Sequence, residues 1–422
     1  MAASVRHRPS LAMILLATSL ATTLACAAHN RPAVVPPPEP AAPPAAVHKA
    51  PVEAPTPPEM PSFRESDEAT SAQLGGALEE GKAVRLELEW VEAREAVSSG
   101  EMAAGEYLVT YLITPADDYY DLEAARSNFP AHHTTVLPGS AHVAVVVRDA
   151  ADGRMVQGLV IHATLHAEDE NGETSALLPY GWHPVLNRYG KNIVLPPSPF
   201  TLSVHIAMPS YSRSDRVNGD RFGRDVIARF EHVTVLPDSL AAASQRLAWG
   251  DSRDALTLAQ SEGAAVDRPL AGLLRDPDAS GAQVRAGEYR IAVVVDHARG
   301  DWEDHGGTLS FISPDSDAKP IMHMGVLVRD AVSGRLIPGL RVRATIINSR
   351  RKVIGTYPLD FTWHPWVSHY GVNVPVPGVG RYTIRVRADA PVFRRYGSGA
   401  LKQFNKPIDV DVRGVRFVTA ER

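Results

Sequence analysis

The sequence predicts an all-β protein with two tandem immunoglobulin-like antiparallel β-sandwiches and a short helical linker between them. Three observations support this fold class: an internal repeat, short valine-rich segments that alternate apolar and polar residues, and frequent turn residues. The 422 residues include 34 prolines and 31 glycines, which break the chain into short segments. About seven short strands per copy are typical of a sandwich, and a β-barrel is the alternative that the same pattern allows.

The internal repeat covers much of the chain. Residues 142–192 align with residues 323–373 without a gap, and 19 of the 51 aligned positions are identical. The tetrapeptide AGEY precedes both blocks, and FTLSVHIAMP faces YTIRVRADAP after them. The chain therefore contains two copies of one domain, which we assign to residues 66–237 and 281–422.

Each copy has the sequence pattern of β-strands. VAVVVRD in the first copy and MGVLVRD in the second are rich in valine and end at an Asp-x-x-x-Gly turn. GLVIHATLHAE and GLRVRATIINS then alternate apolar and polar residues, as half-buried strands do. Residues 238–280 are instead rich in alanine and leucine. We expect one or two short helices there, which either link the sandwiches or pack on a face of one of them.

The N-terminal residues carry targeting signals rather than fold. Residues 1–25 combine a positively charged start with an apolar stretch of 13 residues. A bilayer-spanning helix needs about 20 such residues, so we expect a signal peptide. Cys26, the only cysteine, follows in TLAC, which resembles the lipobox of bacterial lipoproteins. We expect Cys26 to be lipidated; the alternative is a chance cysteine beside an ordinary signal peptidase site.

A proline-rich segment follows the cysteine. Residues 26–65 contain 12 prolines between positions 32 and 61. The 30 residues from position 32 to 61 are expected to be extended, at about 3.1 Å per residue, and to span up to roughly 90 Å. This segment predicts a tether between a membrane and the sandwiches, or else a disordered leader without a spacing role. With a single cysteine, a disulfide framework within the chain is excluded.

Composition and motifs argue against two classes of function. The formal net charge of −5 lacks the basic excess that a nucleic-acid-binding protein usually shows. The sequence has no hydrolase elbow, phosphate loop or helical His-Glu-x-x-His motif. We therefore expect neither nucleic-acid binding nor an enzyme.

Histidines are the polar residues that stand out in the second copy. TWHPWVSHYGVN supplies His364 and His369, and the strand segment IMHMGVLV supplies His323 beside Met322. Imidazoles suit copper, iron and zinc, and a thioether favours Cu(I). These four residues predict a transition-metal site. The alternative is structural: a histidine before proline often hydrogen-bonds backbone, and methionines near a strand start often fill the core.

The first copy keeps only part of this set. His142 and His183 correspond to the first two histidines, but Arg188 replaces the third in GWHPVLNRYGKN. A guanidinium is permanently charged and repels a metal cation. We interpret His142 and His183 as a degenerate site and expect the second copy to be the working one.

These residues resemble the periplasmic ferrous-iron transport protein family, which includes a spirochaete lipoprotein antigen. MHMGVLVRDAVSGRLIPGLRV and HYGVNVPVPGVGRYTIRVRADAP carry the resemblance. It implies immunoglobulin-like sandwiches, often dimeric, that bind copper or iron and serve iron permeases. It assigns the family's strand histidine to His323 and its His-Tyr-Gly histidine to His369. His364 is nearest to the family's loop methionine, Met324-Gly325 stands where an acidic residue is usual, and Tyr396 replaces a later histidine.

Together these expectations describe a lipid-anchored extracytoplasmic protein, in the periplasm or on the outer face of a membrane, that binds copper or ferrous iron for iron uptake. Its expected partners are the membrane, through the lipid anchor, and an iron permease. The chain is expected to dimerise, or to mimic a dimer within one chain as an intramolecular pseudo-dimer. The alternative is a structural or interaction lipoprotein of the cell envelope that is indifferent to metal.

Overall fold

A computed structural model gives the structure of the protein. It describes the following residues, all of which belong to one compact unit that starts at Thr56: 62–120, 139–168, 172–244, 253–275, 280–314, 320–396 and 403–418. The expected signal peptide, Cys26 and most of the tether lie outside the described residues, so those expectations stay predictions. Within the described ranges, no helix combines the length and the apolar character that crossing a bilayer requires.

The first repeat starts with a helix that the sequence analysis did not predict. This helix, α1, spans Ser71–Arg94 and begins at a capping box, in which Thr70 and Gln73 each bind the backbone N–H of the other. The strands of the first repeat are β1 (Ser98–Ala104), β2 (Tyr107–Pro115), β3 (Tyr119–Tyr120), β4 (Ser140–Asp149), β5 (Ile161–Ala167), β6 (Glu173–Leu177), β7 (Tyr180–Trp182), β8 (Arg188–Val194), β9 (Phe200–Ile206), β10 (Ser212–Ser214) and β11 (Val226–Val233).

The second repeat follows two helices, α3 (Pro237–Ser244) and α4 (Arg253–Leu273). Both lie in the segment that was expected to be a helical linker. The strands of the second repeat are β12 (Ser280–Ala286), β13 (Tyr289–His297), β14 (Asp301–Asp304), β15 (Leu309–Ile312), β16 (Ile321–Asp330), β17 (Val342–Ile347), β18 (Val353–Trp363), β19 (His369–Pro375), β20 (Gly380–Ala388), β21 (Arg394–Tyr396) and β22 (Ile408–Phe417).

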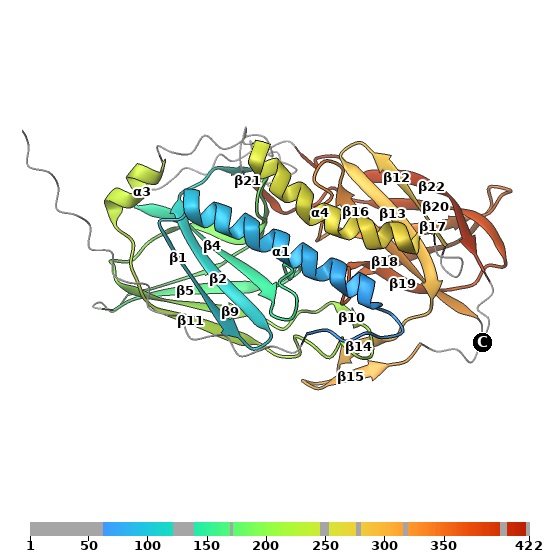
Figure 1. Ribbon diagram of the computed structural model, residues 1–422, viewed down its shortest axis with the longest axis horizontal. Helices are drawn as coiled ribbons and strands as arrows, with labels where there is room; N and C mark the ends of the chain where they lie inside the picture. The colour runs from blue at the N-terminus through green and yellow to red at the C-terminus, as the bar shows by residue number, and fades with distance from the viewer. Residues whose placement is uncertain are drawn as a thin grey trace, which may run out of the picture. The chain divides into compact units, whose positions relative to one another are not determined.

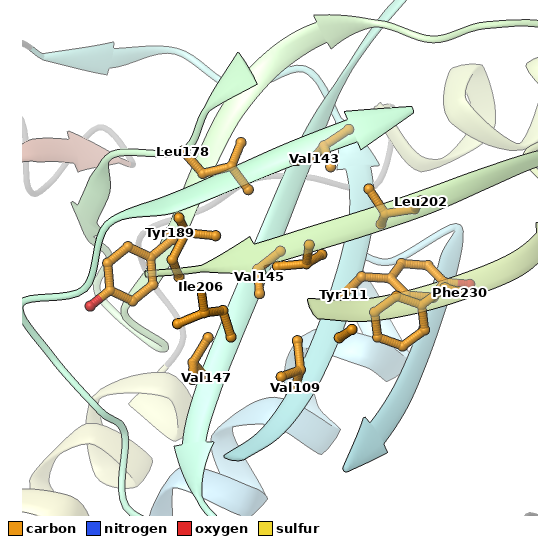
Figure 2. Close-up of a cluster of buried hydrophobic side chains, with 14 of the residues drawn as sticks. Val109, Tyr111, Val143, Val145, Val147, Leu178, Tyr189, Leu202, Ile206 and Phe230 are labelled. Atoms are coloured by element: carbon orange, nitrogen blue, oxygen red, sulfur yellow. The ribbon is translucent and has the colours of Figure 1, made fainter. Parts of the chain in front are cut away.

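Each repeat is a β-sandwich with its own buried core. In the first, the sheet that contains β1, β2, β4 and β8 faces the sheet β11-β9-β5-β6. Val143, Val145 and Val147 alternate along β4 and meet Leu202 and Ile206 of β9 in this core (Figure 2). In the second, β12, β13, β16 and β19 face β17, β20 and β22. The predicted sandwich class is confirmed, and the barrel alternative is wrong because the sheets of the described chain are open.

The two repeats exchange strands and aromatic side chains. The short strand β10 of the first repeat pairs with β18 and β14 of the second. In return, β21 of the second repeat pairs with β7 and β3 of the first. Trp363 of the second repeat is buried in the core of the first sandwich, and Trp182 of the first repeat is buried in the core of the second. Each repeat therefore completes a sheet and a core of the other.

Helices α1 and α4 lie side by side (Figure 1). They are antiparallel, because Gly76 near the start of α1 meets Pro269 near the end of α4, while Glu87 near the end of α1 lies with Glu262 in the middle of α4. A hypothetical Cβ on Gly76 would lie 3.0 Å from Cγ of Pro269. The close approach of the two helices therefore depends on small residues.

The helices also belong to the internal repeat. Glu80-Gly81 of α1 and Glu262-Gly263 of α4 are 182 positions apart, the same offset as between the two AGEY tetrapeptides at 104–107 and 286–289. A Cβ added to Gly81 would lie 1.8 Å from the carbonyl oxygen of Asp152, and one added to Gly263 would lie 2.0 Å from that of Ser333. Each helix thus rests by a glycine on a turn of its own repeat, and α4 is the counterpart of α1 rather than a linker.

Candidate metal centre

Strand alternation decides which side chains of β16 reach the candidate site. Met322 and Met324 are buried in the core of the second sandwich, and His323 between them points to the opposite face. Across the strand pair, His323 lies opposite Asn373 of β19. Met322 therefore does not join the histidines, and its predicted role as a ligand is wrong because adjacent strand residues point to opposite faces.

His323 and His369 form a close imidazole pair. His369 is the first residue of β19, and its Nε2 lies 2.9 Å from Nε2 of His323. The two rings are nearly perpendicular, with centroids 5.1 Å apart. Gly371 makes room for them, because a Cβ at this position would lie 2.6 Å from the His323 ring. The two strands therefore bring together two imidazoles that are 46 residues apart in the sequence.

Hydrogen bonds at the other ring nitrogen fix the tautomer of both imidazoles. Nδ1 of His369 lies 3.1 Å from the Val367 carbonyl oxygen, which can only accept, so this nitrogen carries the hydrogen. Nδ1 of His323 lies 3.3 Å from Oδ1 of Asn373, whose amide is oriented by two hydrogen bonds with the Arg299 backbone. In neutral rings, both Nε2 atoms therefore present lone pairs to each other. With the hydrogen on Nε2 of His323 instead, the same 2.9 Å contact is a neutral N–H···N hydrogen bond; with both hydrogens on Nδ1, a cation between the two Nε2 atoms satisfies both lone pairs.

The surroundings disfavour the proton. Burial, followed by a contribution from Arg299, lowers the pKa of His323 to about 3. Burial, His323 and Arg299 lower the pKa of His369 to about 3 as well. Both rings are therefore uncharged at neutral pH, which is the state in which imidazole binds metals.

The space beside the pair suits a single ion. A cavity of about 20 Å³, comparable to one water molecule, is lined by His323, His369, Asp296 and Arg299. Two nitrogens at about 2.05 Å from one ion, and at right angles to each other, lie about 2.9 Å apart. The described residues contain no group of three or more His, Cys, Asp or Glu side chains arranged to hold a metal ion. The imidazole pair is therefore the preformed part, and a third protein ligand requires a side-chain movement.

His364 has a different environment. Its Nδ1 accepts the backbone N–H of Trp366 at 3.4 Å, so Nε2 carries the hydrogen. This Nε2 lies 3.6 Å from a carboxylate oxygen of Glu68, and the His364 ring centroid is 6.0 Å from that of His369. His364 is fully buried, and burial lowers its pKa well below the ordinary value. The structure thus brings His364 beside the pair, facing Glu68.

Glu68, which the sequence analysis missed, supplies the carboxylate. It lies in the segment that leads into α1, and its Oε2 is 3.8 Å from Nε of Arg299. Burial raises its pKa to about 7; Arg299 opposes this rise, while Asp215 and Asp296 add to it. The capping-box pattern of Thr70 and Gln73 would have placed a helix start here. An acidic cavity of about 540 Å³, lined by Glu68, Asp215, Asp296 and Arg299 among others, adjoins this carboxylate.

The first repeat contains a corresponding site, in which an arginine side chain takes the place of one histidine. Nδ1 of His142 lies 3.1 Å from Oδ1 of Asn192, which matches the bond between His323 and Asn373. Arg188 stands in the place of the last histidine and is fully buried. Its guanidinium lies 3.5 Å from Glu95 and 3.9 Å from Asp117. A buried guanidinium therefore takes the place that His369 has in the second repeat, and the degenerate site stays a prediction.

His183 and Tyr396 complete the comparison between the two sites. His183 accepts the backbone N–H groups of Val185 and Leu186 at its Nδ1, so both copies use this loop histidine to order the loop backbone. Tyr396 packs against the His142 ring and donates to the Gly190 carbonyl at 3.1 Å. The tyrosine that replaces the expected later histidine therefore lies in the site of the first repeat, not in that of the second.

Comparison with known proteins gives weak similarities. No family model matches the chain, and no curated protein matches it significantly. FetP of uropathogenic E. coli is 17% identical over 35% of this chain and 100% of its own length, with a TM-score of 0.25. A copper-bound variant of the P19 protein of Campylobacter jejuni is 12% identical over 34% of this chain and 99% of its own, also with a TM-score of 0.25. Similarities of this size do not establish a family or a function for the chain.

Proposed function

We propose that the second repeat binds one transition-metal ion through Nε2 of His323 and Nε2 of His369. The observation that supports this most directly is the imidazole pair. Two Nε2 lone pairs, with tautomers set by carbonyl acceptors, face each other at 2.9 Å in a buried site. A divalent or monovalent metal ion satisfies both nitrogens at once, whereas burial opposes a shared proton.

Glu68 and His364 form the next layer of the proposed site. The side chain of Glu68 is 20% exposed, and its carboxylate lies 3.8 Å from Arg299, so in its ionised form it favours a second cation nearby. Nε2 of His364 lies 3.6 Å from this carboxylate, which is beyond hydrogen-bond distance, so the two groups are neighbours in the site. The carboxylates that line the adjoining cavity attract a cation and favour its approach to the imidazole pair. No reaction is needed for such a role, and we propose binding rather than catalysis.

The donor set narrows the choice of metal. With Met322 turned into the core, the case for a thioether ligand disappears. Two imidazoles with a carboxylate nearby suit Fe(II) and Cu(II). We therefore keep copper or ferrous iron as the proposed ion, as the resemblance of the sequence implied.

The cellular role extends this proposal. A lipid anchor at Cys26 and a proline-rich tether would hold the sandwiches at the surface of a membrane, outside the cytoplasm. A buried site that offers two fixed imidazoles leaves other coordination positions of the metal ion free for exchange. Such a site suits capture and release better than permanent storage. We propose that the chain captures the ion and hands it to a permease for iron uptake.

Calorimetric titration of the full chain in mild detergent, under anaerobic conditions, tests the proposal. Fe(II), Cu(I) and Cu(II) are titrated in turn into the wild type and into His369→Ala. We expect one site per chain, which the substitution removes without unfolding the protein. Absence of saturable binding by the wild type would refute the proposal and would favour the alternative, a structural or interaction lipoprotein.

A further inference from the structure

An arginine of the first repeat holds the histidine loop of the second. Arg154 is buried, and its Nη2 donates to the carbonyl oxygens of His364 at 3.2 Å and Pro365 at 2.9 Å. Its Nε donates to Asp152 at 2.6 Å, so the guanidinium is fixed at both ends. Helix α1 supports this turn from behind, because Gly81 packs directly on the Asp152 carbonyl.

This contact affects the positions of both loop histidines, His364 and His369. The loop that Arg154 holds continues to Trp366 and Val367. The N–H of Trp366 sets the tautomer of His364, and the carbonyl oxygen of Val367 sets that of His369. A shift of the loop would therefore turn the His369 ring away from its partner and move His364 relative to Glu68.

The loop of the first repeat is held by an equivalent arginine contact, and we call each of these two contacts a clamp. Arg335 of the second repeat, which corresponds to Arg154, donates to the carbonyl oxygens of His183 at 2.8 Å and Val185 at 3.0 Å. It is also buried, and Glu262 lies 4.0 Å from its Nε. The chain thus contains two equivalent clamps, of which only one holds a loop that ends at the imidazole pair.

We propose that Arg154 is a positioning residue for the metal site, and that holding this loop is a function that the first repeat performs for the second. The proposal builds on the proposed function, since it names what orients the two imidazoles. It also gives the first repeat a role that needs no metal of its own. Second-layer partners of metal ligands typically contribute about 10–100-fold to metal affinity.

The matched variants Arg154→Lys and Arg335→Lys test the proposal in the full chain. Lysine keeps the charge beside the buried acids but has a single nitrogen, so it cannot hold Asp152 and the two loop carbonyls from separate donors as Nε and Nη2 of Arg154 do. Circular dichroism and thermal unfolding establish that both variants fold. Cu(II) affinity is measured by competition with a chelator. We expect Arg154→Lys to weaken Cu(II) binding about 10–100-fold and Arg335→Lys to leave it unchanged.

A second measurement does not depend on metal binding. Imidazole ¹⁵N resonances of the metal-free protein report tautomer and surroundings. Arg154→Lys is expected to shift those of His364 and His369 but not that of His183, and Arg335→Lys is expected to do the reverse. Equal effects of the two variants on either measurement, or no effect of Arg154→Lys on the resonances, would overturn the proposal. If the wild type binds no copper, the proposed function fails while the resonances still decide whether Arg154 positions the loop.

Discussion

Trp363→Ala tests how far the two sandwiches depend on each other. Trp363 belongs to the second repeat, yet it is buried at 4% exposure in the core of the first. Its ring meets Phe222 and Phe63 edge-on, with centroids 5.9 and 5.7 Å apart. The substitution therefore removes a large apolar group from a sandwich that is more than a hundred residues away in the sequence.

The size of the effect follows from the buried area. A tryptophan side chain buries about 150–250 Å², which at about 25 cal/mol per Å² corresponds to about 4–6 kcal/mol. Alanine keeps part of this contribution, and measured losses for such changes are about 3–5 kcal/mol. We expect Trp363→Ala to lower the free energy of unfolding by this amount.

Urea unfolding measures the total loss, and native-state hydrogen exchange shows where it acts. We expect amides of β4 in the first sandwich to lose protection at least as much as those of β16 in the second. Val326→Ala, which truncates a residue buried only in the second core, is the control and should act first on β16. If Trp363→Ala left β4 fully protected while β16 lost protection, the burial of Trp363 in the first core would be refuted.

Two further predictions concern the sites. The pKa of Glu68 is raised to about 7, so its carboxylate is ionised above this pH and gains a proton as the pH falls; Cu(II) affinity should fall about 100-fold between pH 8 and pH 5 by proton competition. Titrations across this range should show no such slope in Glu68→Gln, and an equal slope would contradict the role of Glu68. Arg188→His removes the fixed cation from the first site and places an imidazole opposite His142, so calorimetry should detect a second, weaker metal ion per chain. A folded variant that still binds one ion would show that the first site lacks more than this residue.

The fold class could be predicted because strand patterns are local signals and because the repeat shows the same pattern twice. Alternation along β4 and β16 places the valines in the cores, as expected. The sequence pattern did not predict α1, because the first turns of this helix contain glycine and alanine and lack a clear apolar stripe. The repeat shared by α1 and α4 was also missed, since it rests on a few positions around Glu80-Gly81 and Glu262-Gly263.

The candidate site was only partly predictable for a similar reason. His323 and His369 come together because neighbouring strands set their register, which the pattern of the repeat anticipates. Met322 was predicted as a ligand together with its neighbour His323, although adjacent residues of a strand point to opposite faces and Met322 points to the core. Glu68 and Arg154 reach the site from other parts of the chain through tertiary contacts that no local spacing encodes.

The proposed metal ion lies between the two Nε2 atoms of His323 and His369. X-ray absorption spectroscopy of the copper-loaded full chain reports the ligands of this ion. We expect two imidazole nitrogens at about 2.0 Å and no sulfur, since Met322 faces the core. A sulfur ligand near about 2.3 Å, or a spectrum that is unchanged in His323→Ala and His369→Ala, would contradict this proposal.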